Sequence, residues 1–332
     1  LLATVLATGC LSAVVAFADD SVALNEMNFP DANFRAYLSE NVDTDGNGVL
    51  SVEERDNHPI ISVANRGITT LKGIEYFPNL KNLSCSKNPL DKLDVSTLTE
   101  LTSLTCMADG LSELNLYENN KLQRLNCANN QLTSLVVLSD SLTKLDCYVN
   151  KLEKLDLTSV PNLKSLRCDQ NSLKSLDLSN NQSLTSINCT YNNLTSLDLS
   201  KNTSLANVTN AMIGNQSVSL KANFDGNMIV IPFENSNLDN DNYVSSTLDD
   251  YGDGSGFIAY DVSEIDGGIE YYCNTKLAGS ENMKVSVTVS RDFHQVSFYA
   301  DSENTSLIGR AFANDGQSVT APEIKNPPQC KV

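Results

Sequence analysis

Side chains that offer oxygen atoms recur at a fixed spacing in the twelve residues from Asp43 to Glu54, which read DTDGNGVLSVEE. Carboxylate, amide and hydroxyl oxygens at loop positions 1, 3, 5, 9 and 12, with a backbone carbonyl at position 7, form the ligand set of a calcium loop. A glycine at position 6, here Gly48, allows the sharp turn that such a loop needs. The spacing therefore predicts a calcium site. Its metal-ligating candidates are Asp43, Asp45, Asn47, Val49, Ser51 and Glu54.

A loop of this kind needs a helix on each side to hold it, and the flanking sequence predicts both. The pattern matches the EF-hand loop D-x-[DN]-x-[DN]-G-x5-E at each defined position. Before the loop, Phe34 and Leu38 lie four residues apart, on one helical face. A second helix is predicted after the loop. Ser51 and Glu54 would start this helix with a capping box, and a nearby proline must keep it short. We expect a small EF-hand-like N-terminal cap over residues 27–58.

The sequence also indicates what a cation would do in this loop. No second calcium loop follows the first in the sequence, so the site is expected to be unpaired. An unpaired extracellular site is expected to be weak, with a dissociation constant on the order of 10⁻⁴–10⁻³ M. Calcium is then expected to stabilise the N-terminal cap and not to act as a switch. The alternative interpretation is an acidic turn that matches the motif by chance.

Internal repetition dominates residues 59–215. Six segments follow L-x-x-L-x-C-x-x-N-x-L, and successive cysteines are 21, 21, 20, 21 and 21 residues apart. The cysteines are Cys85, Cys106, Cys127, Cys147, Cys168 and Cys189. This period and pattern are typical of leucine-rich repeats. The alternation predicts short strands that stack into a parallel sheet on one side of a solenoid, and the L-x-L motif in the second half of each repeat predicts a second strand opposite.

The cysteines occupy inward positions that leucine usually takes, so we interpret them as reduced thiols that fill the core. The alternatives are occasional disulfides between neighbouring repeats and a thiolate metal site. Three residues after each cysteine stands an asparagine, or in one repeat Asp109, whose amide is expected to bond the backbone of adjacent turns. In the first and last repeats, Val63 and Asn210 are predicted at the position of the cysteine.

Composition narrows the function further. The formal charge of −18 argues against nucleic-acid binding, which depends on basic side chains that neutralise phosphates. Only two histidines are present, far apart in sequence, and no Ser-His-Asp or Cys-His arrangement is apparent, so we expect no enzyme. Residues 1–18 are apolar and end in A-F-A, which predicts a secretory signal peptide that lacks its basic n-region. A lipidated Cys10 and a retained anchor are the alternatives. No membrane span is expected in the mature chain.

The stretches NFPDANFRAYLSENVDTDGNGVLSVEE and GITTLKGIEYFPNLKNLSCSKNPL resemble the internalin-like, secreted leucine-rich-repeat surface proteins of Firmicutes, which carry an EF-hand-type calcium loop before such repeats. The resemblance covers residues 27–215. It implies a bacterial cell-surface protein whose repeats bind other proteins in adhesion, host proteins among them. Residues 216–291 alternate in a pattern that predicts a β-rich, sandwich-like cap domain. Residues 292–332 are similar to the start of an internalin B-repeat, a small β-grasp module.

The predicted fold class is mainly β with few helices: a solenoid of about 21-residue leucine-rich repeats between the EF-hand-like cap and a β-sandwich or β-grasp-like C-terminal region. Outward strand positions would line the concave face. They include an aromatic-plus-basic patch on this acidic chain, namely Arg124, Lys144, Tyr148 and Arg167. We expect a protein partner with an acidic surface to bind there. The alternatives are a solvated face, on which Asp146 and Arg167 pair with each other, and a non-binding stalk that displays further C-terminal modules.

Overall fold

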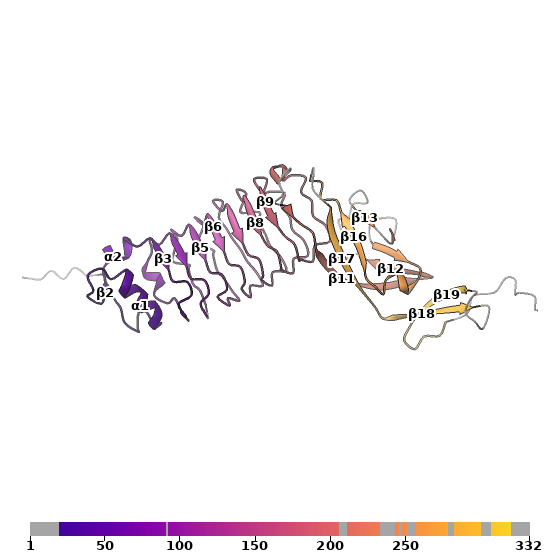
Figure 1. The fold of residues 1–332 in the computed structure, drawn as a ribbon, viewed down its shortest axis with the longest axis horizontal. Helices are drawn as coiled ribbons and strands as arrows, with labels where there is room; N and C mark the ends of the chain where they lie inside the picture. Colours follow the sequence, from indigo (N-terminus) through magenta and orange to yellow (C-terminus); the bar gives the residue numbers. More distant parts are fainter. Residues whose placement is uncertain are drawn as a thin grey trace, which may run out of the picture.

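The structure is a computed structural model. It describes residues 20–90, 92–205, 211–232, 243–245, 248–250, 256–277, 282–299 and 307–319. The molecule is elongated, with a small helical cap at one end of a solenoid and β-rich segments at the other (Figure 1). The predicted signal peptide, residues 1–18, lies outside the described residues. In the ranges that the structure describes, no helix has the length and apolar character needed to cross a membrane.

The N-terminal cap is built from two short strands and two helices. Strand β1 spans Val22–Ala23, helix α1 Ala32–Asn41, strand β2 Val49–Leu50 and helix α2 Val52–Asp56. Helix α1 begins where the Asp31 side chain accepts a hydrogen bond from the Phe34 amide (2.9 Å), and it buries Phe34 and Leu38. The other carboxylate oxygen of Asp31 accepts from the backbone and the hydroxyl of Thr69, 2.8 and 3.0 Å away. One side chain therefore both caps the helix and ties it to the first repeat.

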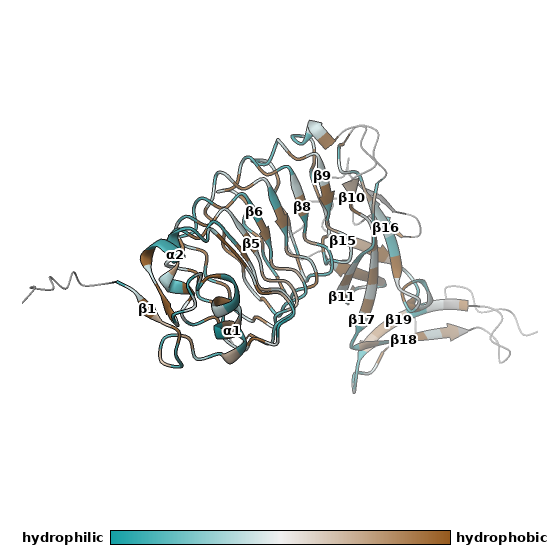
Figure 2. Cartoon of the chain, turned by 60° about the vertical axis from the view of Figure 1, so that its left-hand side comes forward, coloured by the Kyte–Doolittle hydropathy of each residue, from teal (hydrophilic) through white to brown (hydrophobic). Residues whose placement is uncertain are grey.

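The repeats form an eight-stranded parallel sheet in which strands β10 to β3 lie side by side in sequence order. The strands are β3 (Ile60–Ser62), β4 (Asn82–Ser84), β5 (Ser103–Thr105), β6 (Arg124–Asn126), β7 (Lys144–Asp146), β8 (Ser165–Arg167), β9 (Ser186–Asn188) and β10 (Ala211–Met212). The central residue of each strand is buried and pairs with its equivalent in the next turn, as Leu104 does with Leu125. The mainly β, parallel-stranded solenoid predicted from the repeat is confirmed (Figure 2).

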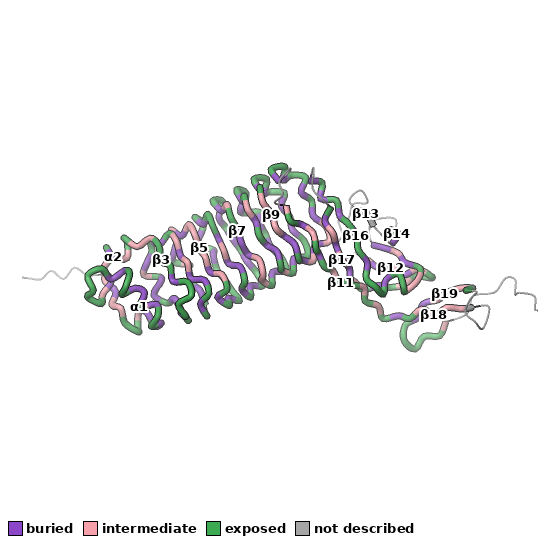
Figure 3. Tube along the Cα trace, viewed as in Figure 1, coloured by how far each residue is buried: buried purple, intermediate pink, exposed green. Residues whose placement is uncertain are grey.

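Buried and exposed residues alternate along each turn of the solenoid (Figure 3). The six ladder cysteines are fully buried free thiols, as the pattern predicts. The regular spacing of the asparagines from repeat to repeat is explained by their hydrogen bonds. The side-chain amide of Asn130 donates to the backbone carbonyls of Cys106 (2.8 Å) and Cys127 (3.0 Å), in adjacent turns. Each buried amide thus joins two turns through groups that would otherwise be unsatisfied.

The side opposite the sheet differs from the prediction of a second strand. Among the described residues, pairing there is limited to one isolated parallel bridge, between Asp94 and Asn115. The acidic residue of the L-D-L motif instead starts a turn, as Asp156 shows by accepting hydrogen bonds from the backbone and hydroxyl of Thr158 (2.9 and 2.7 Å). The side chain thereby captures an amide that a strand would leave for its neighbour.

The last turn of the solenoid corrects the predicted alignment. Strand β10 pairs with β9 so that Ile213, which is buried, follows the strand at the position of the cysteine. Asn210, predicted at this position, lies outside the described residues and precedes the strand. Gln216 replaces the ladder asparagine and donates to the carbonyls of Cys189 and Ile213, both 3.0 Å away. The alignment failed because the connection into this turn is longer and its apolar residues depart from the leucine pattern.

The β-rich segment after the solenoid forms a seven-stranded sheet in the order β13-β16-β17-β11-β12-β15-β14. Its strands are β11 (Gln216–Asp225), β12 (Met228–Pro232), β13 (Tyr243–Ser245), β14 (Asp249–Asp250), β15 (Gly256–Ala259), β16 (Ile269–Cys273) and β17 (Met283–Arg291). Long strand β11 pairs with β17 in one half and β12 in the other. Phe257 and Tyr271 lie on strands that are far apart in this order, yet their ring centroids are 5.5 Å apart. The sheet therefore folds over itself at β11, where a sandwich of two sheets was predicted.

This folded sheet closes the open end of the solenoid. The hydroxyl of Tyr271 donates to the Thr195 carbonyl (2.9 Å), and the Leu199 amide donates to the Thr275 carbonyl (2.8 Å). Beyond it, β18 (Phe293–Tyr299) and β19 (Leu307–Asn314) form an antiparallel hairpin. The remainder of the predicted β-grasp module, residues 320–332, lies outside the described residues. Three 3-10 helices, at Ile74–Tyr76, Thr203–Leu205 and Val262–Glu264, complete the described elements.

Candidate functional site

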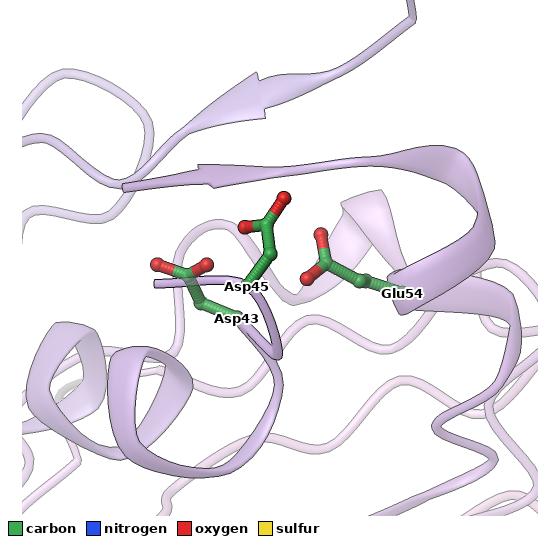
Figure 4. A group of neighbouring side chains, drawn as sticks. All are labelled: Asp43, Asp45 and Glu54. Carbon is green, nitrogen blue, oxygen red and sulfur yellow. The ribbon is translucent and has the colours of Figure 1, made fainter. Parts of the chain in front are cut away.

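The predicted calcium loop joins helix α1 to strand β2 and helix α2. Its first, third and twelfth residues point toward one another across the loop, as Figure 4 shows for Asp43, Asp45 and Glu54. One carboxylate oxygen of each of these residues lies within 4.8 Å of the others. Asp43 and Glu54 are buried and Asp45 is exposed, so the cluster opens to solvent on one side. The sequence spacing therefore does bring three candidate ligands together.

Glu54 is fixed by four hydrogen bonds. One of its carboxylate oxygens accepts from the backbone and hydroxyl of Thr44 (2.6 and 2.8 Å), and the other from the backbone and hydroxyl of Ser51 (both 2.9 Å). These donors, with the Ser51 backbone contributing most, lower the pKa of Glu54 to about 2 despite its burial. Glu54 is therefore anionic at neutral pH, and it closes the loop while it completes the capping box of α2.

The first turn of the loop is shaped by its own backbone amides. The Gly48 amide donates to Asp43 (2.9 Å), and the Asn47 amide donates to Asp43 and Asp45 (3.1 Å each). Gly46 and Gly48 have φ angles of +69° and +79°, in the left-handed region that glycine adopts without strain. The requirement for glycine at loop position 6 is thus visible in the backbone.

The other three candidate ligands occupy different places. Asn47 lies beside Asp45, to which its side-chain NH2 group donates (2.8 Å). The side-chain oxygen Oδ1 of Asn47 accepts from the backbone amide of Val49 (2.7 Å). Val49 belongs to β2, and the Ser51 hydroxyl is engaged with Glu54. The structure thus groups Asn47 with the carboxylates, whereas the Ser51 side chain serves as the N-cap of α2.

The loop has a partner strand that the sequence analysis missed. Strand β2 pairs antiparallel with β1, with Val22 opposite Leu50 and Ala23 opposite Val49. The Leu24 amide also donates to the Gly48 carbonyl, 2.9 Å away. The signal for this pairing was weak, because two apolar residues just after the predicted signal peptide do not make a recognisable strand. The exit of the predicted calcium loop is therefore supported by strand β1.

The donor set fits a hard divalent cation. Three carboxylates within 4.8 Å of one another repel unless a cation offsets their charge, and oxygen is the ligand atom that calcium prefers. Asp43, Asp45 and Asn47 have oxygens at or beside the cluster. Both oxygens of Glu54 already accept two hydrogen bonds each, so Glu54 would ligate a cation by giving up those from Thr44.

The second predicted site lies on the outward face of the parallel sheet. Lys144 pairs in register with Arg124 of the preceding turn. The Arg167 guanidinium stacks on the Tyr148 ring, 4.0 Å from its centroid. The Tyr148 hydroxyl also lies 3.7 Å from the sulfur of Met107, two turns away. The four residues predicted to form one patch therefore lie on three successive turns of the sheet, with Tyr148 and Arg167 in direct contact.

Two aspartates change the charge of this patch. Lys144 pairs with Asp146 (3.1 Å) and Arg167 with Asp169 (3.6 Å), so each ion pair forms within one turn. The alternative in which Asp146 pairs with Arg167 is therefore wrong. Both aspartates are buried, and each has one carboxylate oxygen that receives no hydrogen bond. Sequence spacing alone would have allowed these pairs, because residues two apart share one face of a strand. The basic character of the patch is partly neutralised.

Comparison with known proteins identifies the fold. No family model and no curated protein matches the sequence. Among solved structures, internalin C2 of Listeria monocytogenes is similar over 60% of this chain and 88% of its own, with 22% identity and a TM-score of 0.50. The internalin InlF of the same organism is similar over 60% of this chain and 66% of its own, with 22% identity and a TM-score of 0.48. The chain thus has an internalin-like leucine-rich-repeat fold.

Proposed function

We propose that this protein is exported to the bacterial cell surface, where it binds another protein through the outward face of its parallel sheet. The observation that carries the proposal is the stack of the exposed Arg167 on the half-buried Tyr148, held on a ladder of paired strands. Tyrosine and arginine are frequent hot-spot residues, and a preformed surface avoids the entropy cost of ordering. The internalin-like fold supports a role in protein interaction over one in catalysis.

The charges around the stack indicate the kind of partner. Arg124, Lys144 and Arg167 supply three cations, while Asp146 and Asp169 supply two carboxylates beneath them. A partner carboxylate would approach Arg124 and the exposed edge of Arg167, whereas Asp146 and Asp169 are buried beneath the patch and are out of reach of a partner. We propose a partner whose contact surface is acidic at its centre, with host extracellular proteins as the first class to test.

Calcium is proposed as the cofactor of the N-terminal cap. Asp43, Asp45, Asn47 and Glu54 would hold it, with the Val49 carbonyl and Ser51 as the remaining ligands predicted from the motif. When bound, calcium would neutralise the cluster and join helix α1 to helix α2. Its role would be to stabilise the cap on which the first repeat is built.

A binding screen tests the proposed surface. Wild-type protein and the Tyr148→Ala/Arg167→Ala variant would be presented to a panel of purified host extracellular proteins, with Lys174→Ala on the opposite side as the control. The double variant should lose roughly 2 kcal/mol or more of binding free energy if both residues are hot spots. The fold should persist because Arg167 is exposed and Tyr148 half-buried. Equal binding by wild type and the double variant would contradict the assignment.

A stalk is the second candidate function. The ion pairs Lys144–Asp146 and Arg167–Asp169 favour it, because they show that two of the three cations of the patch already have partners within the fold. If the repeats are a stalk, they should bind no partner themselves, and their role would be to hold further modules away from the cell surface. The same screen separates the two functions, because a stalk gives no signal that depends on Tyr148 or Arg167.

A further inference from the structure

The side of the solenoid opposite the parallel sheet, here called the back face, also presents ordered columns of side chains. One column, the acid column, consists of Asp94, Asn115, Val136, Asp156, Asp177 and Asp198. The next outward position, two residues later in each turn, forms the hydroxyl column of Ser96, Tyr117, Leu138, Thr158, Ser179 and Ser200. The bridge between Asp94 and Asn115 fixes the alignment of successive turns. Both columns follow directly from the L-x-L motif.

The two columns belong together because each pair closes a turn. Asp156 accepts hydrogen bonds from the backbone and hydroxyl of Thr158, and Asp177 and Asp198 accept from the backbone two residues later (2.9 and 2.8 Å). These bonds lower the pKa of all three aspartates, which are anionic at neutral pH. Asp198 already pairs with Lys276 (3.5 Å), so Asp156 and Asp177 supply the uncompensated charge. The acidic residues are exposed.

Two adjacent turns break this pattern. Val136 replaces the aspartate and Leu138 replaces the hydroxyl residue in one turn, and Tyr117 replaces the hydroxyl residue in the turn before. A valine cannot accept the hydrogen bond that closes the equivalent turns, so the substitution gives up a local interaction. The three side chains remain exposed, by 64% for Tyr117, 46% for Val136 and 37% for Leu138. Each side chain therefore leaves a substantial part of its apolar surface in contact with solvent.

These residues lie close enough to act together. Successive turns of the solenoid are spaced as neighbouring strands are, about 4.8 Å apart. Tyr117 and Leu138 are therefore one turn apart in the same column, and Val136 is in the neighbouring column of the same turn as Leu138. They form an apolar patch, beside which Asp156, Asp177 and Asp198 continue the acid column on one side, while Asn115 separates it from Asp94 on the other. Exposed Glu118 and Asp140 follow Tyr117 and Leu138 in their own turns, so acidic side chains border the patch on more than one side.

A second copy of the chain fits this surface poorly. A symmetric contact centred on the patch would bring two strongly acidic chains together, because each carries a formal charge of −18. A complementary partner would present apolar side chains to the patch and basic side chains to the aspartates beside it. We propose that the back face is a second docking surface, for a protein segment whose apolar residues cover Tyr117, Val136 and Leu138 and whose lysines or arginines lie along Asp156 and Asp177.

A designed variant isolates the apolar part of this surface. The change Val136→Asp/Leu138→Ser restores the residues that the chain uses at the equivalent positions of other turns, so the variant should fold and melt at the same or a higher temperature. It also adds negative charge. Binding that depended on electrostatics alone would therefore strengthen, whereas binding that needs the apolar patch would weaken.

Fluorescence anisotropy with a labelled synthetic peptide measures the effect. The peptide has a leucine-rich end followed by four lysines, and a second peptide with glutamates in place of the lysines serves as its control. We expect the full chain to bind only the lysine peptide, at least tenfold more weakly after Val136→Asp/Leu138→Ser and at least threefold more weakly after Asp156→Asn/Asp177→Asn. The Tyr148→Ala/Arg167→Ala variant should bind as wild type does, which separates this surface from the proposed concave site.

Three outcomes would overturn the proposal. No binding of the lysine peptide by wild type would show that the surface does not take a cationic segment. Equal or tighter binding by Val136→Asp/Leu138→Ser would show non-specific attraction to an acidic protein. Sedimentation that detects a wild-type dimer, lost in this variant, would assign the patch to contact between two copies of the chain.

Discussion

At the scale of single residues, Asp109 is the most informative departure from the repeat. It takes the place of a ladder asparagine. Its carboxylate accepts a hydrogen bond from the backbone amide of Asn88 (2.8 Å) and lies 3.7 Å from the sulfur of Cys85. Burial raises its pKa to about 6, although the Asn88 amide opposes the shift. Unlike Asn130, an ionised Asp109 has no N–H group to donate to the carbonyls of adjacent turns. The ladder is weakest at this position.

Replacing this residue should therefore stabilise the protein in a pH-dependent way. Because burial raises the folded-state pKa from its usual 3.8 to about 6, wild type loses stability as the pH rises from about 4 through 6, by about 1 to 2 kcal/mol once solvent screening is allowed for. Asp109→Asn removes this loss, so the two proteins should differ little at pH 4 and most above pH 7. Urea unfolding at both pH values measures the difference.

The reverse change in a neighbouring turn is the matched control. Asn130→Asp removes an amide that donates to Cys106 and Cys127, so it should destabilise the protein at pH 7 by about 2 kcal/mol or more. If Asp109→Asn proved no more stable than wild type above pH 7, the carboxylate would have to be satisfied by contacts beyond those described.

At the scale of elements, the N-terminal cap depends on Glu54. Because its hydrogen bonds lower its folded-state pKa from the usual 4.5 to about 2, its contribution is complete above pH 4.5 and is lost as the pH falls through 2. Glu54→Gln should cost about 2 kcal/mol at pH 7, since it replaces an ionised acceptor of four hydrogen bonds. Thermal unfolding of this variant, compared with Glu53→Gln in the same helix, measures the cost.

The same element tests the proposed cofactor. With a dissociation constant near 1 mM, 10 mM calcium should stabilise wild type by about 1.4 kcal/mol. The variants Asp43→Ala and Glu54→Gln should lose this increment, while Glu53→Gln should keep it. If all four proteins respond alike to calcium, the loop is not a structural calcium site.

Sequence reasoning succeeded where one residue type recurs in one role. The leucines and cysteines alternate directly with outward residues, so the parallel sheet and its buried thiols follow from spacing alone. The loop glycine and the carboxylates of the cap are equally local, and their convergence was predicted. A helix start such as Ser51 could be predicted because the capping box lies within four residues.

Features that depend on distant or irregular segments were missed. The partner strand Val22–Ala23 is too short to carry a pattern. A second buried ladder, in which Asn181 donates to the carbonyls of Leu157 and Val160, was hidden because Ser139 and Val160 interrupt it. The ion pairs beneath the concave patch depend on side-chain conformations that spacing leaves open. Tertiary contacts decided each of these cases.

At the scale of the whole molecule, the solenoid is a stack of turns that contact only their neighbours, closed by a different cap at each end. Such arrays are expected to open from their ends, because a terminal turn has one stabilising interface fewer. The six ladder thiols are distributed evenly along the stack and are fully buried. Burial also raises their pKa, to about 12 for Cys127 and Cys189, so little reactive thiolate forms without opening. The cysteines can therefore report where the stack opens.

Alkylation of the native protein should accordingly be slow at all six ladder positions and fast in denaturant, where all six ladder thiols should be recovered. Weakening the N-terminal cap with Glu54→Gln should speed alkylation at Cys85 by tenfold or more while Cys168 changes little, because local opening costs less free energy at the damaged end. Truncation after residue 215 removes the bond from Tyr271 to Thr195 and should instead speed alkylation at Cys189. Mass spectrometry of the labelled peptides gives each rate. Equal acceleration at Cys85 and Cys189 in both variants would show that the solenoid unfolds as one cooperative unit.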